Sequence, residues 1–277
     1  MKKIYKIITA AAVALLAAGC TANNSSEEAT AKSRTTISTP TIFFHGYGSS
    51  SHAEEHMANA AKSMGATNKI IKANVSKNGS VTLEGKINHN SKNPIVEVNF
   101  EDNINADYHQ DGKYALNVVK RLQKSYNFKK MNMVGHSMGN MAIMFYLLNN
   151  AKNKNLPTLN NQVDIAGHFD GIIGYDEPAG LKVNAKTGKP NKETSSYKEL
   201  LPLKKYYPHA RVLNLYGDYE NGGDQRVSIT SSKTLKYIVL PNAKSYQEKK
   251  FTGRNAQHSR LHSNPEVDRA LVNFLWK

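Results

Sequence analysis

The stretch "MVGHSMGN", residues 133–140, holds the pattern Gly135-x-Ser137-x-Gly139. Glycines at both flanking positions are typical of a serine on a sharp turn between a strand and a helix, with its hydroxyl clear of the sheet. The pattern fixes only three positions, so it decides little by itself. The rest of the chain must supply a strand before it, a helix after it, an acid, a base and amide donors.

The segments on either side of the pattern fit this requirement. "KMNMV", residues 130–134, predicts a short strand, and "MGNMAIMFYLLNN", residues 138–150, is apolar enough to predict a buried helix. Gly135 and Gly139 lack a Cβ atom where the strand and the helix approach each other. A helix that begins near Met138 would aim its first amides at negative charge developing beside Ser137.

Strand and helix patterns alternate from residue 37 to residue 277. Strands are predicted at 42–44, 93–102, 130–134, 161–169 and 210–218, helices at 51–65, 112–127, 138–150 and 265–276, a hairpin at 68–87, and a helix start followed by a strand within 228–239. This alternation favours an α/β fold with a mostly parallel sheet in one domain. Residues 170–208, rich in Gly, Pro, Lys and Asn, predict an insertion after the sixth strand.

The N-terminus predicts export. "MKKIYKIITAAAVALLAAGC" joins a basic head to an apolar stretch that is too short to span a membrane comfortably, so residues 1–19 are expected to be a signal peptide. Its ending resembles a bacterial lipobox, which implies that the first residue after cleavage, Cys20, carries lipid. Cys20 is the only cysteine, so it cannot form an internal disulfide. Residues 20–36 are then a flexible tether, and the protein is lipid-anchored on the extracellular face of the bacterial membrane.

The chain is basic, with a formal net charge of +15. This balance favours anionic partners such as lipid headgroups or envelope polymers. The basic residues are scattered and no nucleic-acid-binding motif is present, so nucleic acid is not expected as a partner. The sequence does not predict an oligomeric state.

Four phrases together resemble the α/β-hydrolase family over residues 37–277, and more closely the predicted cell-surface hydrolases of Gram-positive bacteria. The phrases are "FFHGYGSS" (43–50), "MVGHSMGN" (133–140), "GDYENGGDQRVS" (217–228) and "AQHSRLHSNPEVDRALVNFLW" (256–276). The resemblance implies a central sheet with helices on both faces. It also implies a Ser-His-Asp hydrolase that needs no cofactor and no metal.

The resemblance places an oxyanion hole around the turn. One donor is the amide of the residue after the nucleophile, Met138, and the other is the amide of Tyr47, which follows His45-Gly46. Gly46 lets the backbone bend toward a substrate carbonyl. His45 is expected to hold this loop in place and to take no part in proton transfer.

The acid is expected after the strand at 210–218. Asp224 begins the phrase Asp-Gln-Arg-Val, which is similar to the family's acid position, whereas Asp218 sits directly at the end of the strand. Asp224 is the first choice and Asp218 the alternate. Asp170 and Asp176, which follow the preceding strand, remain open as less favoured candidates.

The base is expected shortly before the last helix. In small secreted lipases of this fold the histidine lies about nine residues before an apolar residue of the closing helix, and His258 to Val267 fits that spacing. His262 is too close to Val267 and is the alternate. The resulting triad is Ser137, Asp224 and His258, and the expected reaction is esterase-like or lipase-like cleavage of a small-molecule or lipid acyl ester.

Other readings stay open. "HAEEH", residues 52–56, matches a zinc-peptidase pattern with His52 and His56 as ligands and Glu55 as base. The oxygen-rich "GDYENGGDQ" does not have the spacing of a dedicated calcium loop. A hydrolase fold that only binds its ligand is a further alternative. The apolar and aromatic residues within 170–208 fit either a lid over an acyl chain or ordinary packing.

Overall fold

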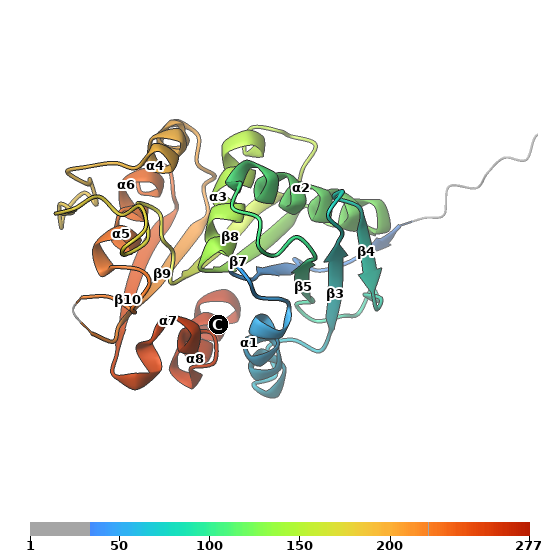
Figure 1. The fold of residues 1–277 in the computed structure, drawn as a ribbon. Coiled ribbons are helices and arrows are strands. Elements are labelled where there is room, and N and C mark those ends of the chain that lie inside the picture. Colours follow the sequence, from blue (N-terminus) through green and yellow to red (C-terminus); the bar gives the residue numbers. More distant parts are fainter. Residues whose placement is uncertain (1–33, 221) are drawn as a thin grey trace, which may run out of the picture. The chain divides into compact units, whose positions relative to one another are not determined.

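The structure is a computed structural model that describes residues 34–220 and 222–277. Eight strands form its central sheet in the order β10-β9-β8-β7-β2-β5-β3-β4 (Figure 1). Their bounds are β2 Thr41–Phe44, β3 Ile70–Val75, β4 Val81–Glu84, β5 Ile95–Phe100, β7 Lys130–His136, β8 Thr158–Ile165, β9 Arg211–Asp218 and β10 Ser245–Thr252. Only β3 and β4 pair antiparallel, as the expected hairpin, so the prediction of a mostly parallel sheet is confirmed.

Helices cover both faces of the sheet, which confirms the expected layers (Figure 1). One face carries α2 Tyr108–Ser125, α3 Met138–Asn150, α4 Ser195–Leu200, the 3-10 helix η1 Leu201–Lys205 and α6 Leu235–Val239, with α5 Ile229–Lys233 just before α6. The other face carries α1 His52–Ser63, the 3-10 helix η2 Arg254–Ala256, α7 His258–Leu261 and α8 Pro265–Trp276. The two cores are therefore separated by the sheet.

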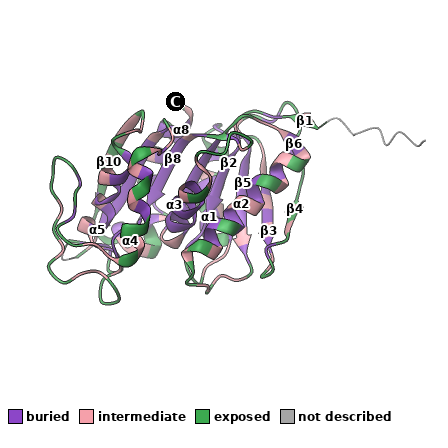
Figure 2. Ribbon diagram, turned by 90° about the horizontal axis from the view of Figure 1, so that it is seen from above, coloured by how far each residue is buried: buried purple, intermediate pink, exposed green. Residues whose placement is uncertain are grey.

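The central strands are buried on both faces. All four residues of β2 are buried, with Ile42 and Phe44 in the core under α2 and α3, and Phe43 in the core under α1 and α8. Figure 2 shows the strands in the buried colour and the outer faces of the helices exposed. A strand covered on both sides needs a continuous apolar run, which is why the sequence predicts these strands well.

A small parallel pair extends the folded unit beyond its expected start. β1 (Thr35–Thr36) pairs with β6 (Tyr126–Asn127). Residues 35 and 36 thus belong to the fold, although the sequence assigns them to the tether. The expected signal peptide, Cys20 and the tether up to residue 33 lie outside the described residues. No helix among the described residues is long and apolar enough to cross a membrane.

The insertion follows β8, the sixth strand of the sheet. Its second half is part of the body: Tyr197, Leu200, Leu203 and Tyr207 are buried in the core that α2 and α3 cover. In its first half the side chain of Tyr175 is 81% exposed. Most of the large side chains that suggested a lid therefore pack as ordinary core.

The prediction for 228–239 is wrong in its second part. Residues 235–239 form the helix α6 instead of a strand, because Leu235, Ile238 and Val239 all point into one core at helical spacing. The last strand is β10, at residues 245–252. β10 lies at the edge of the sheet and is only partly buried, so it lacks the apolar run by which buried strands are recognised.

Candidate active site

Ser137 lies on the turn that joins β7 to α3, at the carboxyl end of the central strands. Its backbone has φ +53°, in the left-handed region that non-glycine residues seldom adopt. The amide of Ser137 donates to the carbonyl oxygen of Ile165 at the end of β8. The neighbouring strand thus fixes the turn, and the strained backbone lifts the hydroxyl clear of the sheet.

The glycines around Ser137 are required by close backbone approaches. A Cβ atom on Gly139 would lie 2.0 Å from the carbonyl oxygen of Phe44, and one on Gly135 would lie 2.7 Å from the amide of Asn140. A Cβ atom on Gly46 would lie 3.0 Å from the Cβ of Ser137 itself. The strand β2 and its following loop therefore touch the turn directly, which is what an oxyanion loop must do.

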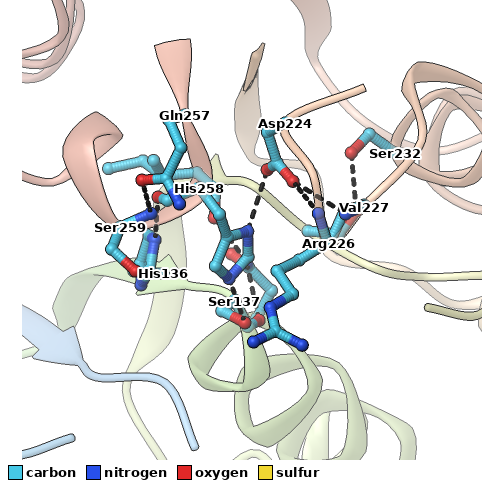
Figure 3. Close-up of polar contacts among 12 residues, drawn as sticks. His136, Ser137, Asp224, Arg226, Val227, Ser232, Gln257, His258 and Ser259 are labelled. Atoms are coloured by element: carbon cyan, nitrogen blue, oxygen red, sulfur yellow. Dashed lines mark hydrogen bonds and ion pairs between the residues drawn. The ribbon is translucent and has the colours of Figure 1, made fainter. Parts of the chain in front are cut away.

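His258 and Asp224 join Ser137 in one chain of hydrogen bonds (Figure 3). Nδ1 of His258 donates to Oδ2 of Asp224 over 2.9 Å. This leaves Nε2 to accept a hydrogen bond from the hydroxyl of Ser137 over 3.0 Å. Asp224 lies in the loop after β9, His258 is the first residue of α7, and Ser137 lies on the turn after β7. The fold thus brings together three segments that are separate in the sequence.

The acid and the base are also held through their backbones. The amide of His258 donates to the carbonyl oxygen of Asp224, and Nε2 of the buried His136 donates to the carbonyl oxygen of His258. Burial lowers the pKa of His136 well below its ordinary value, so this ring is neutral. The side chain of Asp224 is 1% exposed, and its Oδ1 accepts from the amides of Arg226 and Val227. These bonds hold the carboxylate in one orientation toward the imidazole.

The alternate acids have other partners. Asp218 forms an ion pair with Nζ of Lys250 on β10 over 2.9 Å. Asp170 accepts from the amide of Thr194, and burial raises the pKa of Asp170 to about 6. Asp176 accepts from an amide within the insertion, that of Ile172. None of the three carboxyl groups is hydrogen-bonded to a histidine in the described residues.

The alternate base, His262, also lies apart from Ser137. Its Nδ1 is 3.2 Å from the hydroxyl of Ser263, and its ring packs edge-on against His136 with ring centroids 4.9 Å apart. Burial lowers the pKa of His262. His262 therefore packs against His136, and among the described residues it is not hydrogen-bonded to Ser137 or Asp224.

Met138 and Tyr47, the two residues predicted to supply oxyanion amides, lie on backbone segments next to Ser137. Met138 is the first residue of α3, and a small cavity lies against Met138 and Gly46. Tyr47 follows Gly46, on which a Cβ atom would lie 3.0 Å from the Cβ of Ser137. The loop is tied down at its next residue, since the amide of Gly48 donates to the carbonyl oxygen of Asn103. The two amides therefore belong to backbone segments that flank the hydroxyl of Ser137.

His45 holds the oxyanion loop. Its Nδ1 donates to the carbonyl oxygen of Gly46 and its Nε2 accepts from the amide of Phe100 at the end of β5. Both ring nitrogens are thus occupied, and burial lowers the pKa of His45. A neutral histidine with both nitrogens engaged positions the loop and has no free nitrogen for proton transfer.

The zinc-peptidase pattern on α1 does not form a common site. Nδ1 of His52 contacts Glu55, whereas Nε2 of His56 contacts Asp268 on α8, and Glu55 also pairs with Lys72. Each side chain of the pattern therefore already has a protein partner. Within the described ranges 34–220 and 222–277 no group of three His, Cys, Asp or Glu side chains is arranged to hold a metal ion.

Three further residues lie at the site, and the sequence predicts no role for them. Nδ2 of Asn140 donates to the carbonyl oxygens of both Ser137 and Ile165, which ties the turn to β8. His168 follows β8 and accepts from or donates to the hydroxyl of Tyr108 over 3.2 Å, and burial lowers the pKa of His168 to about 3. Arg226 points its side chain toward Ser137 (Figure 3). The only sequence signal was their position inside or beside the quoted phrases.

Comparisons with known proteins bear on the family and the fold of the chain, and not on individual site residues. The profile of a family described as alpha/beta hydrolase of unknown function (DUF915) matches residues 28–277. A gene product of Listeria innocua aligns with 86% of this chain and 94% of its own at 27% identity and a TM-score of 0.77. A Lactobacillus plantarum protein called a cell surface hydrolase aligns with 87% of this chain and 90% of its own, at 21% identity and a TM-score of 0.67. No protein of curated function matches the sequence.

Proposed function

The chain belongs to the family of alpha/beta hydrolases of unknown function (DUF915), and from this premise we propose that it is a serine esterase that hydrolyses carboxylic (acyl) esters. Ser137 is the nucleophile, His258 the general base, and Asp224 the acid that orients the base. One observation carries the proposal: Nε2 of His258 lies 3.0 Å from the hydroxyl of Ser137 while Nδ1 lies 2.9 Å from Asp224. These residue types at these distances are those that acyl transfer requires.

Acylation follows from the arrangement. His258 takes the proton of Ser137 as Oγ attacks the ester carbonyl, and Asp224 stabilises the imidazolium that results. The negative charge on the carbonyl oxygen is received by the amides of Met138 and Tyr47, and losing one such donor costs about 3 kcal/mol of transition-state stabilisation. The tetrahedral intermediate then collapses, and the imidazolium gives its proton to the departing alcohol.

Deacylation repeats the sequence with water. His258 removes a proton from a water molecule, whose oxygen attacks the acyl carbon on Ser137. The same two amides receive the charge, and the proton returns to Oγ of Ser137 as the carboxylic acid leaves. Every proton transfer in the cycle therefore passes through His258, which needs no metal or cofactor.

The proposal is tested by labelling Ser137 with a fluorophosphonate probe. We expect the full chain to be labelled at a single site, and we expect Ser137→Ala to abolish labelling while its circular dichroism spectrum stays unchanged. Hydrolysis of 4-nitrophenyl acetate should disappear in the same variant. Folded protein that is neither labelled nor active would instead indicate a binding protein built on a hydrolase fold.

The acyl group is tested by a series of 4-nitrophenyl esters of increasing chain length. A lipase-like site would prefer long chains, whereas an esterase-like site would prefer short ones. In the insertion, Tyr175 and its neighbours lie on the exposed side, so we propose this first half, and not the buried second half, as the part that covers an acyl chain.

We further propose that Cys20 carries a lipid that anchors the protein at the extracellular face of the bacterial membrane. The support is the lipobox-like ending of the N-terminal signal and the absence of any other cysteine in the chain. Cys20→Ala should release the protein from membranes. Continued membrane association of that variant would count against lipidation.

A further inference from the structure

Arg226 is fixed at its backbone by the acid of the proposed triad. Its amide donates to Oδ1 of Asp224 over 2.9 Å, and its carbonyl oxygen accepts from the amide of Ile173 over 2.9 Å. Gln225, which lies between Asp224 and Arg226, has φ +80°, and this conformation turns the chain sharply after Asp224. The direction in which Arg226 leaves the backbone is thus set by the same loop that sets the acid.

The side chain of Arg226 runs beside the triad. Figure 3 shows it extending from the Asp224 loop past His258, with its guanidinium group directed toward Ser137.

This guanidinium has no acidic partner in the part of the chain that the structure describes. The carboxylate of Asp224, two residues earlier, already uses Oδ1 for two amides and Oδ2 for His258. Arginine stays charged at any physiological pH and offers five donors in a fork that matches carboxylate and phosphate oxygens. An exposed arginine aimed at the nucleophile therefore offers a binding position to an anion.

Exposed apolar side chains lie on the loops that adjoin the Ser137 turn and Arg226. Tyr47 and Ile104 are exposed on the oxyanion side, on loops that the bond from Gly48 to Asn103 ties together. Ile173 is exposed on the other side, where its amide contacts Arg226. The ligand that fits one cation between apolar edges is an amphiphile with a negative group.

We propose that the substrate of Ser137 is an ester that carries a carboxylate or phosphate group close to its scissile carbonyl, and that Arg226 binds this group. The inference rests on the proposed esterase activity and names its substrate class. The anionic group takes part in no bond change: it is held by the guanidinium while Ser137 and His258 carry out acylation and deacylation. Arg226 is thus a residue that determines specificity.

The test compares neutral and anionic esters of the same size on the full chain. The 4-nitrophenyl esters of pentanoic acid and glutaric acid differ by one terminal carboxylate on the acyl side. Butyryl glycerol and butyryl glycerol phosphate differ by one phosphate on the alcohol side. Vesicles of phosphatidylglycerol and emulsified diacylglycerol, which lacks the phosphate, then distinguish a lipid source of the anion from a soluble one.

We expect the anionic member of at least one pair to have a kcat/KM about 10- to 100-fold higher, as one charge-assisted contact contributes. Arg226→Gln should remove this preference and leave the neutral ester within about threefold, since the contact concerns only the charged group. Arg226→Lys should retain part of it, and added salt should reduce it. The control Arg254→Gln removes another exposed arginine, four residues before His258. It should leave kcat/KM unchanged for both the neutral and the anionic esters.

Two results would overturn the inference. One is equal kcat/KM for neutral and anionic esters in all three comparisons. The other is an Arg226→Gln variant that loses neutral and anionic substrates alike, which would indicate a structural role in the Asp224 loop. Fluorophosphonate labelling of Ser137 separates these failures from failure of the esterase proposal: labelled protein without anion preference refutes only the role of Arg226.

Discussion

The nucleophile turn (residues 133–140) and the acid–base loops (218–228 and 253–263) contribute to one site in different ways. The turn is fixed mainly by its own residues: Gly139 allows the close contact with β2, and Asn140 caps the carbonyl of Ser137. The acid–base loops depend on contacts between residues far apart in sequence, such as the bond from His258 to Asp224. A short motif therefore specifies the turn at Ser137, whereas assembly of the sheet brings Asp224 and His258 to it.

The largest expected effect separates the two histidines of the second loop. His258→Ala should lower kcat by about 10⁴- to 10⁶-fold, because no other imidazole is hydrogen-bonded to Ser137 in the described residues. His262→Ala should change kcat by less than about tenfold, since its ring packs on His136. Steady-state hydrolysis of 4-nitrophenyl acetate measures both. The reverse order of effects would show that His262, and not His258, is the general base.

The next effect separates the two candidate acids. Asp224→Asn keeps the shape of the side chain but disturbs the tautomer of His258, and it should lower kcat by about 10³- to 10⁴-fold. Asp218→Asn breaks only an exposed ion pair with Lys250 and should leave kcat within about threefold. The same assay decides between them. A large loss of kcat in Asp218→Asn would indicate that Asp218, at the end of β9, is the acid of the triad.

A third change tests how strictly the nucleophile turn is specified by local contacts. Gly139→Ala places a methyl group against the carbonyl oxygen of Phe44, so we expect the free energy of unfolding to fall by about 3 kcal/mol or more. Gly65→Ala is the matched control: its φ is +69° but open space surrounds it, and the expected cost is about 1 kcal/mol. Urea denaturation measures both. An equal loss of unfolding free energy in the two variants would mean that the backbone around Gly139 shifts to accommodate the methyl group.

The smallest effect concerns a buried carboxyl beside the turn. Asp164 on β8 is paired in register with Gly135, is 0% exposed, and has one oxygen, Oδ2, without a protein partner. Burial raises the pKa of Asp164 from 3.8 to about 7. The folded state therefore holds this proton over a range where the unfolded state has lost it, so stability falls as the pH rises from about 4 to above 7.

Asp164→Asn should remove this dependence. We expect the variant to be more stable than the parent at pH 8, by about 1 to 3 kcal/mol, and nearly equal to it at pH 4. Urea unfolding at the two pH values gives the comparison. If the variant loses stability equally at both, the Asp164 carboxylate is stabilising in its ionised form and the sign of the effect is reversed.

The sheet was predictable where its strands are buried on both faces. β2 carries the continuous apolar run Ile42–Phe44, and β7 is buried over all but its first residue, as strands between two layers of helices are. β10 was missed because an edge strand keeps polar residues on its open side. The sequence predicts a strand where α6 forms, because a short apolar run such as Tyr237-Ile238-Val239 fits both the helical and the strand period.

The site shows the same division. The resemblance ranked Asp224 above Asp218 and His258 above His262, and the structure brings Asp224 and His258 to Ser137. Arg226 lies two residues after Asp224, but the sequence predicts no role for it. A sequence pattern does not indicate the direction in which a long side chain points. The approach of Arg226 to Ser137 depends on the strained turn at Gln225 and on the bond from Ile173.

The sequence by itself determined the alternation of strands and helices, the serine on its glycine-flanked turn, and the short set of acids and bases that follow it. These depend on local periodicity and on backbone sterics, which neighbouring residues express directly. Only the tertiary structure decided which acid and which histidine meet Ser137, and that Arg226 faces it. The bond between Ser137 and His258 joins residues 121 positions apart, and its geometry is set by how eight strands pair side by side.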